Sequence, residues 1–176
     1  MKFSLSLCGV ALALSTATSV SAQSLATWTQ PVNVATTDGA LTKTGGCDGC
    51  PDAGAHAAVS ITGDGYVEYA PSSGFLVSAG LSASATAAPS TAIDFAFNTW
   101  PSGAWEVREK GVYRQEGSYA AGDRLSVSVE FGRVVYRKNS VVVYTSAAAP
   151  APTMTFSATL LTAGASLTNA IIGAVL

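Results

Sequence analysis

The residues with the widest chemical range lie together in one short glycine-rich segment. Cys47 and Cys50 form a C-x-x-C pair, Asp48 and Asp52 carry carboxylates beside them, and His56 is the only histidine of the chain. In an oxidising compartment the paired cysteines predict a disulfide that stiffens this loop. A zinc site built from Cys47, Cys50 and His56 is the alternative, and it lacks an obvious fourth ligand. The two aspartates do not complete an oxygen-ligand loop for calcium, so we predict no metal and no other cofactor.

The sequence of the same segment does not favour nucleophilic or redox catalysis. A redox-active C-x-x-C pair needs its first cysteine at a helix N-terminus, where the thiol pKa falls, and no helical pattern follows Pro51. A Ser-His-Asp arrangement would have to use His56, and the chain contains no G-x-S-x-G elbow. Its alanine neighbours (Ala55, Ala57 and Ala58) place this histidine in a loop or at a strand edge. We therefore expect a surface histidine, exposed or hydrogen-bonded.

Glycoside hydrolysis requires two carboxylates that face the same bond of the substrate. Glu106 and Glu109 are three residues apart, so on a regular strand they point to opposite faces. The chain has no Glu-x-Asp-x-Glu motif. Other carboxylates stand alone in the sequence: Glu68, Asp94, Glu116 and Glu130. An enzyme is therefore the third choice, behind a binding role and a structural role.

A cluster of aromatic residues is more informative. Trp100, Trp105, Tyr113 and Tyr119 lie close in sequence to polar groups that could bind sugar hydroxyls. We assign Trp105 to the core, whereas Trp100 lies in a turn and is expected to be more exposed, although a loop tryptophan can also cap a sandwich. The predicted ligand contacts are Asp94, Asn98, Trp100 and Arg108.

These residues must be positioned by β-strands, because the sequence shows no long helical period. Leu125, Val127 and Val129 alternate with polar residues, which is typical of a half-buried strand. Strand-like segments recur about every ten residues with turn signals between them, the pattern of an antiparallel β-sandwich. The other expected strands are 32–34, 58–62, 66–69, 75–79, 93–98, 105–109, 134–137, 141–145, 154–161 and 166–174.

Turn residues divide these strands. Hairpin signals are Asp64-Gly65, Lys110-Gly111, Gly122-Asp123, Gly132-Arg133 and Asn139-Ser140. Longer loops are expected at 45–54 and 82–90, and a Pro/Ala connector at 147–152. No charged side chain follows Lys138, but prolines and threonines in this tail favour two core strands over a membrane segment.

The N-terminal segment has the layout of a secretory signal peptide. A lysine is followed by a mostly apolar run and by Val20-Ser21-Ala22, which predicts cleavage after Ala22. Residues 23–176 then form a single domain. A net charge of −2 and only 11% charged residues give no electrostatic basis for binding nucleic acid or anionic lipid. We therefore expect a secreted protein, extracellular or periplasmic, without stable membrane insertion.

Several short motifs resemble a family of bacterial and slime-mould extracellular domains with a concanavalin A-like, SPRY-like jelly-roll fold. The similar segments are 41–44, 47–50, 52–55, 61–68, 93–96, 109–113, 122–123 and 135–139, within a resemblance that covers about residues 28–174. Pro51 and Ser140 depart from the pattern, in which an aromatic residue and a glycine are expected. The resemblance implies an all-β jelly roll with a binding role, because such domains often accompany adhesive or carbohydrate-active modules.

The leading hypothesis is thus a non-catalytic module that binds carbohydrate or another extracellular surface or matrix component. Self-association through charge-poor sheet edges is the alternative, with 141–144 and 171–175 as the edges concerned. The N- and C-terminal strands are expected to lie close together.

Overall fold

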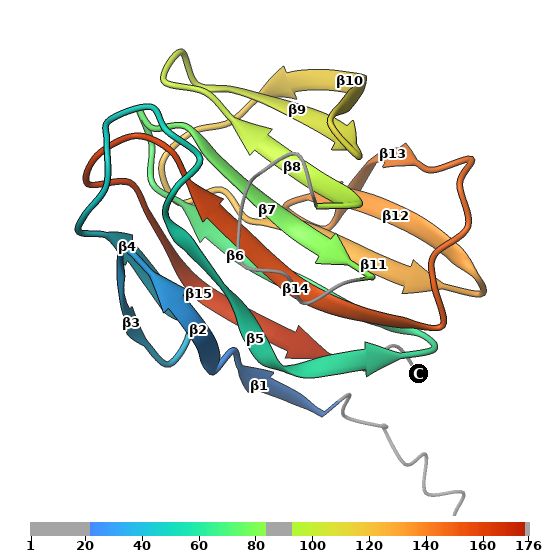
Figure 1. Cartoon of the computed structure of the whole chain (residues 1–176). Coiled ribbons are helices and arrows are strands. Elements are labelled where there is room, and N and C mark those ends of the chain that lie inside the picture. The colour runs from blue at the N-terminus through green and yellow to red at the C-terminus, as the bar shows by residue number, and fades with distance from the viewer. Residues whose placement is uncertain (1–21, 84–92, 175–176) are drawn as a thin grey trace, which may run out of the picture.

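The structure, a computed structural model, describes residues 22–83 and 93–174, and these residues form two antiparallel β-sheets packed face to face (Figure 1). The predicted antiparallel sandwich is confirmed, and no helix occurs in the described ranges. The described residues therefore contain no helix that could cross a membrane. The predicted signal peptide lies almost wholly outside the described residues, as does most of the loop expected at 82–90.

The first sheet has eight strands, of which seven are neighbours in the order β13-β12-β11-β6-β15-β4-β3, while β1 pairs with β15. In that order their bounds are Val141–Thr145, Arg133–Lys138, Leu125–Glu130, Gly65–Pro71, Ser166–Gly173, Ala40–Lys43 and Val34–Thr37, with β1 at Gln23–Leu25.

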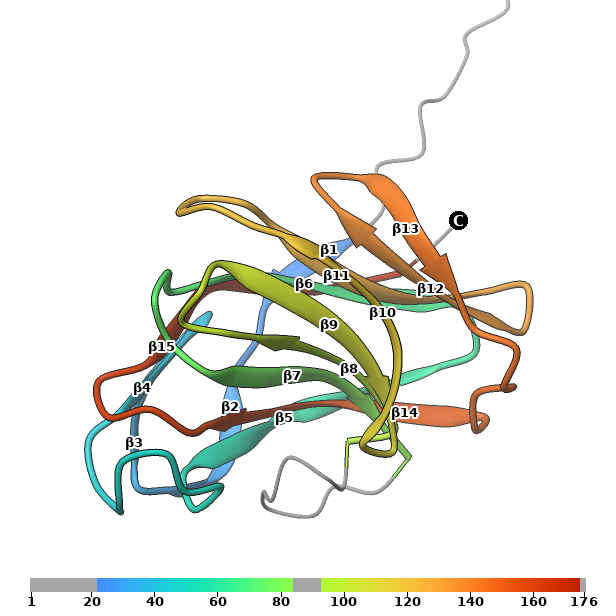
Figure 2. The same ribbon diagram turned by 90° about the horizontal axis from the view of Figure 1, so that it is seen from above.

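The second sheet has seven strands in the order β10-β9-β8-β7-β14-β5-β2. In that order their bounds are Val112–Ser118, Ala104–Glu109, Phe95–Thr99, Val77–Ser82, Thr153–Leu160, Gly54–Thr62 and Trp28–Val32. Figure 2 shows the two sheets as two layers, with the chain passing from one to the other.

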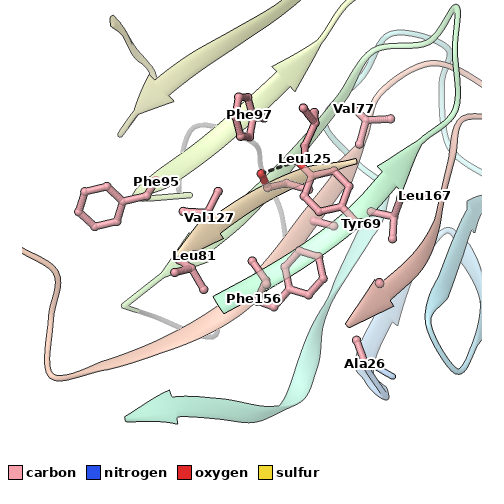
Figure 3. Packing of buried hydrophobic residues seen from close by; sticks show 14 of the residues in the cluster. Ala26, Tyr69, Val77, Leu81, Phe95, Phe97, Leu125, Val127, Phe156 and Leu167 are labelled. Carbon is pink, nitrogen blue, oxygen red and sulfur yellow. Dashed lines mark hydrogen bonds between the residues drawn. The ribbon is translucent and has the colours of Figure 1, made fainter. Parts of the chain in front are cut away.

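Large aromatic side chains fill the space between the layers. Tyr69 from β6 lies beside Phe156 from β14, with 5.7 Å between ring centroids (Figure 3). The Tyr69 hydroxyl donates a hydrogen bond to the carbonyl oxygen of Ala79 in the opposite sheet, at 3.0 Å. Complete burial of Phe156 contributes about 1.5–3 kcal/mol. The core therefore joins strands that are distant in the sequence.

Two predicted hairpins are confirmed, and a third is displaced by one residue. Lys110-Gly111 and Asn139-Ser140 have positive φ at both residues, as a type I′ turn requires. They connect β9 to β10 and β12 to β13. The turn between β11 and β12 uses Phe131-Gly132, with φ of 50° and 74°, in place of the predicted Gly132-Arg133.

The hairpins predicted at Asp64-Gly65 and Gly122-Asp123 are wrong. Strands β5 and β6 flank Asp64 but belong to different sheets, and so do β10 and β11 on either side of Gly122. Gly63 carries the positive φ of the first connection, and the Asp64 carboxylate accepts a hydrogen bond from the backbone N–H of Phe131. Both turns therefore direct the chain into the other layer.

Other differences concern strand boundaries. The strand expected at 32–34 is divided at Asn33, whose φ is 53°, so β2 and β3 enter different sheets. Strands β1, β4 and β10 are not predicted, because none has a clear apolar alternation. The loop at 45–54 and the connector at 147–152 are present, although β5 already begins at Gly54.

The uncharged tail forms two interior strands, as expected. β14 lies between β7 and β5, and β15 lies between β6 and β4. The prediction that 171–175 forms a sheet edge is wrong, because Ile171 in β15 pairs with both Glu68 and Leu25. Pairing of β1 with β15 confirms that the terminal strands are close together. Strand β13 does form an edge, as predicted.

Candidate functional site

Two neighbouring strands place two of the predicted contact residues on one outer face. In β8 Phe97 lies in the core, so the next residue, Asn98, points to the outside of the second sheet. In β9 Val107 lies in the core, and Arg108 follows on the outside. The two strands are directly paired, with Asn98 opposite Glu106. The hairpin thus carries Asn98 and Arg108 on the same surface.

Trp100 begins the turn that joins these strands. Its backbone N–H donates to the carbonyl oxygen of Ala104 at 2.8 Å, and the N–H of Gly103 donates to the carbonyl oxygen of Trp100 at 3.0 Å. Gly103 has a φ of 80°, a left-handed conformation that glycine adopts without strain. The turn is therefore tightly closed, and the half-buried Trp100 side chain lies against the outer face near Asn98.

Trp105 belongs to the core, as predicted. It is 4% exposed, packs edge-on against Phe97 at 5.4 Å, and donates from Nε1 to the carbonyl oxygen of Ser118. Tyr119 is also buried, whereas Tyr113 is 47% exposed on β10. Tyr113 therefore lies on the surface, outside the core that contains Trp105.

Arg108 is held in place by two hydrogen bonds. Its Nε donates to Oε2 of Glu106 at 2.7 Å, and its Nη1 donates to the carbonyl oxygen of Gly111 at 3.0 Å. The second bond ties the guanidinium group to the turn between β9 and β10. A guanidinium fixed in this way presents its remaining N–H groups without a further loss of side-chain entropy.

Asn98, Trp100 and Arg108 line one cavity of about 240 Å³. Apolar walls complete it: Leu76, Ile93, Ala96, Gly111 and Leu161. Asn98 Oδ1 and Trp100 Nε1 are both buried and have no hydrogen-bond partner among the described residues. Buried polar atoms without a partner cost about 1–3 kcal/mol each. One acceptor and one donor beside this cavity are therefore unsatisfied.

A row of hydroxyl groups extends from Asn98 across the sheet. The register places Ser78 of β7 opposite Asn98 and Thr159 of β14 opposite Ser78. Ser78 Oγ and Thr159 Oγ1 are fully buried and, within the described part of the chain, also lack a partner. Sequence reasoning missed both, because only the strand register brings them beside Asn98.

Asp94 lies apart from these three residues. It precedes β8 and lines a different cavity, together with Glu109. Its Oδ2 accepts a hydrogen bond from the N–H of Ala83 at 2.6 Å, and Lys110 Nζ lies 3.7 Å from its Oδ1. The structure therefore groups three of the four predicted contacts and separates the fourth.

The C-x-x-C loop contains the predicted disulfide, and it packs against Lys43, a buried lysine at the end of β4. Cys47 and Cys50 are bonded to each other. The Nζ of Lys43, a residue only 4% exposed, donates to three carbonyl oxygens and one carboxylate, at 2.8–3.1 Å: Cys47 O, Cys50 O, Leu161 O and Asp52 Oδ1. The lysine thus supplies a fixed positive charge to a loop whose carbonyl groups converge.

Asp52 completes this arrangement. The hydrogen bond from Lys43, together with one from the backbone N–H of Cys47, holds the pKa of the Asp52 carboxyl below its usual value. Asp48 is engaged elsewhere, because its Oδ1 accepts from the N–H of Ala163. The side chains that could bind a metal in this loop are Cys47, Cys50 and Asp52. The disulfide occupies both sulfurs, so the set does not fit a zinc ion.

The expectation of a surface histidine is wrong. His56 lies within β5, between Thr29 and Ser157 of the flanking strands, and is 4% exposed. Burial lowers the pKa of its imidazole. Nδ1 of His56 and Oγ of Ser157 are buried without a partner in the described ranges. Glu106 and Glu109, by contrast, point to opposite faces as predicted, with Glu109 turned inward.

Comparisons with known proteins place the fold and no more. No family model and no curated protein sequence matches the chain. Among solved structures, the TRIM65 PSpry domain aligns with a TM-score of 0.60 at 15% identity, over 82% of this chain and 88% of that one. The carbohydrate recognition domain of Emp46p, in a metal-free form, aligns with a TM-score of 0.60 at 9% identity, over 85% and 89%. The chain has a concanavalin A-like jelly-roll fold.

An enzyme also has this architecture. A prokaryotic β-1,3-1,4-glucanase (lichenase) derived from a mouse hindgut metagenome aligns with a TM-score of 0.50 at 10% identity, over 82% of this chain and 84% of that one. At these identities the likeness concerns the fold alone. The fold is shared by binding modules and by enzymes, so function has to be argued from the residues of the site.

Proposed function

We propose that this protein is a secreted, non-catalytic binding module that recognises carbohydrate or another extracellular surface component. One observation carries the proposal: Asn98 and Trp100 line the same cavity, and Asn98 Oδ1 and Trp100 Nε1 are both buried without a hydrogen-bond partner among the described residues. Arg108 adds a fixed cation to the same wall. Hydroxyl groups of a sugar both donate and accept hydrogen bonds, so they suit an acceptor and a donor placed together.

The size of the cavity limits what can enter it. Its volume of about 240 Å³ is below the ~300–1,000 Å³ of sites for drug-sized ligands. A single sugar residue, such as the end of a glycan chain, is therefore the proposed occupant. The half-buried indole of Trp100 offers an apolar surface for the C–H face of the ring.

The lining of the cavity favours binding over hydrolysis. None of its described residues carries a carboxylate. Glu106, which lies opposite Asn98, is paired with Arg108. Glycoside hydrolases act through two carboxyl groups placed about 5–10 Å apart on either side of the scissile bond. Hydrolase activity is therefore the third choice, and turnover of a polysaccharide panel would support it.

Glycan-array binding of the purified protein tests the proposal. We expect saturable binding that is lost in Trp100→Ala. Tyr113→Ala is the matched control, because Tyr113 is an exposed aromatic residue on β10 that does not line the cavity. Binding that survives Trp100→Ala would reject this site, and silence across the array from a folded protein would reject carbohydrate as the ligand.

A structural role through self-association is the second candidate, and the edge of the first sheet favours it. Strand β13 has no charged residue, and Val141 and Val142 are 66% and 51% exposed. Uncharged edge strands can pair with another chain. Molecular mass that rises with concentration, and that stays constant in Val142→Lys, would establish this role. A monomer at all concentrations would exclude it.

A further inference from the structure

A second cavity, of about 380 Å³, opens beside the hairpin of β9 and β10. Phe95 and residues 148–151 of the Pro/Ala connector form an apolar wall. Glu109 and Arg114 form the polar wall. The volume lies within the ~300–1,000 Å³ typical of small-molecule sites.

Glu109 is an unusual residue to find in the wall of such a cavity. It points to the inner side of the second sheet and is 5% exposed. Its Oε2 accepts a hydrogen bond from Nε of Arg114 at 2.9 Å. Its Oε1 is buried and, among the described residues, has no partner. A buried carboxylate oxygen is a strong acceptor, so this atom calls for a donor.

A β-bulge positions the partner of Glu109. Tyr113 pairs with Arg108 and Gln115 pairs with Val107, so Arg114 is the extra residue of β10. A bulge breaks the alternation of side chains and often re-aims one beside a functional site. Here the bulge lets the partly exposed Arg114 side chain reach Glu109 and hold one of its two oxygens.

The charges around the cavity are balanced. Arg114 offsets Glu109, and at the rim Lys110 lies 3.7 Å from the Asp94 carboxylate. A cationic ligand would meet no net negative charge, and an anionic ligand would face the unpartnered carboxylate oxygen. The ligand that fits this lining is therefore apolar and carries one neutral hydrogen-bond donor.

We propose that the cavity beside Glu109 binds a small apolar ring carrying one neutral hydroxyl or N–H donor, with Glu109 Oε1 as the acceptor and the wall of Phe95 and residues 148–151 as the apolar contact. The ring belongs either to a free small molecule or to a side chain of a polypeptide, such as tyrosine. This site is independent of the cavity at Trp100 and of carbohydrate binding.

Titration of the isotope-labelled protein with phenol, followed by NMR, tests the proposal. A ligand of this size is expected to bind in the millimolar range. We expect saturable shifts of the backbone amides at 94–95, 109–114, 148, 149 and 151, because Pro150 has no amide proton. Fluorobenzene has a similar shape without the donor, and it should bind about tenfold more weakly, which corresponds to 1.4 kcal/mol. N-acetyltyrosine amide is the second probe: if it binds as phenol does, the site accepts a polypeptide side chain, and if phenol alone binds, the ligand is a free small molecule.

Two variants complete the test. Ala149→Trp fills the cavity from an exposed position, so it should abolish phenol binding without affecting the fold. Glu109→Met should remove the preference for phenol over fluorobenzene. The proposal is overturned if phenol gives no saturable shifts in a folded protein, if fluorobenzene binds equally well, or if Ala149→Trp leaves phenol binding unchanged.

Discussion

Replacement of Lys43, the buried lysine at the end of β4, should destabilise the protein. In Lys43→Met the ammonium group is lost while most of the aliphatic stem is retained. Four acceptors lose a hydrogen-bond donor, and the energetic cost differs among them. Cys47 O still accepts from the N–H of Cys50, and Leu161 O still accepts from the N–H of Gly49.

The expected magnitude follows from the acceptors that remain. Cys50 O has no second donor among the described residues, and an orphaned acceptor costs about 1–3 kcal/mol. The two carbonyl oxygens that keep one donor add roughly 0.5 kcal/mol each. Asp52 is 37% exposed, so water replaces much of its bond to Lys43 and we add nothing for it. The total is about 2–4 kcal/mol.

Urea unfolding followed by circular dichroism measures this loss. For a domain of this size, a loss of about 3 kcal/mol corresponds to a Tm lowered by roughly 6–12 °C. Lys110→Met is the matched control, because the Lys110 side chain is 77% exposed, and its effect should stay within about 0.5 kcal/mol. If Lys43→Met costs no more than this control, the convergent carbonyl groups do not depend on the lysine and the reasoning is refuted.

Two further predictions concern single groups. The lowered pKa of Asp52 means that its charge stabilises the fold above the usual pKa of 3.8, and that this stabilisation is lost as the pH falls through the folded-state pKa. Asp52→Asn should therefore be less stable than the original chain near neutral pH, and the difference should vanish under strongly acidic conditions; a pH-independent difference would contradict the linkage. Tyr69→Phe removes the hydroxyl bond to Ala79 and should cost about 1 kcal/mol in thermal unfolding. Tyr136→Phe removes a buried hydroxyl that has no partner within the described ranges, so it should be neutral or stabilising, and an equal loss in both variants would argue against this account.

Turn chemistry predicted a hairpin correctly only where the next strand stays in the same sheet. Lys110-Gly111 and Asn139-Ser140 form their hairpins because the strands on either side remain in one sheet. Asp64-Gly65 has an equally good hairpin signal, yet the chain crosses to the other sheet there. A turn motif specifies a local reversal of the chain. The sheet that the next strand joins depends on distant pairing, which a local pattern does not encode.

The candidate site shows the same division. Asn98, Trp100 and Arg108 could be predicted together because a single hairpin carries them. Ser78 and Thr159 could not, because they reach Asn98 only through the pairing of β7 with β8 and with β14.

Buried polar residues were the hardest to predict. Lys43 precedes Thr44 and two glycines, a context that predicts an exposed lysine, but it is buried because four acceptors surround its ammonium group. His56 has small neighbours that suggest a loop, but alanine also fits the crowded interior of a sheet, where β5 is covered on both edges.

The central claim is that the cavity of Asn98, Trp100 and Arg108 binds the ligand. The most direct measurement is an NMR titration with the glycan that binds most strongly on the array. We expect amide shifts to concentrate at residues 76, 93–100, 108–111 and 161, and to disappear in Trp100→Ala. Shifts centred instead on the outer face of the first sheet, around Tyr66, Arg124 and Arg137, would contradict it.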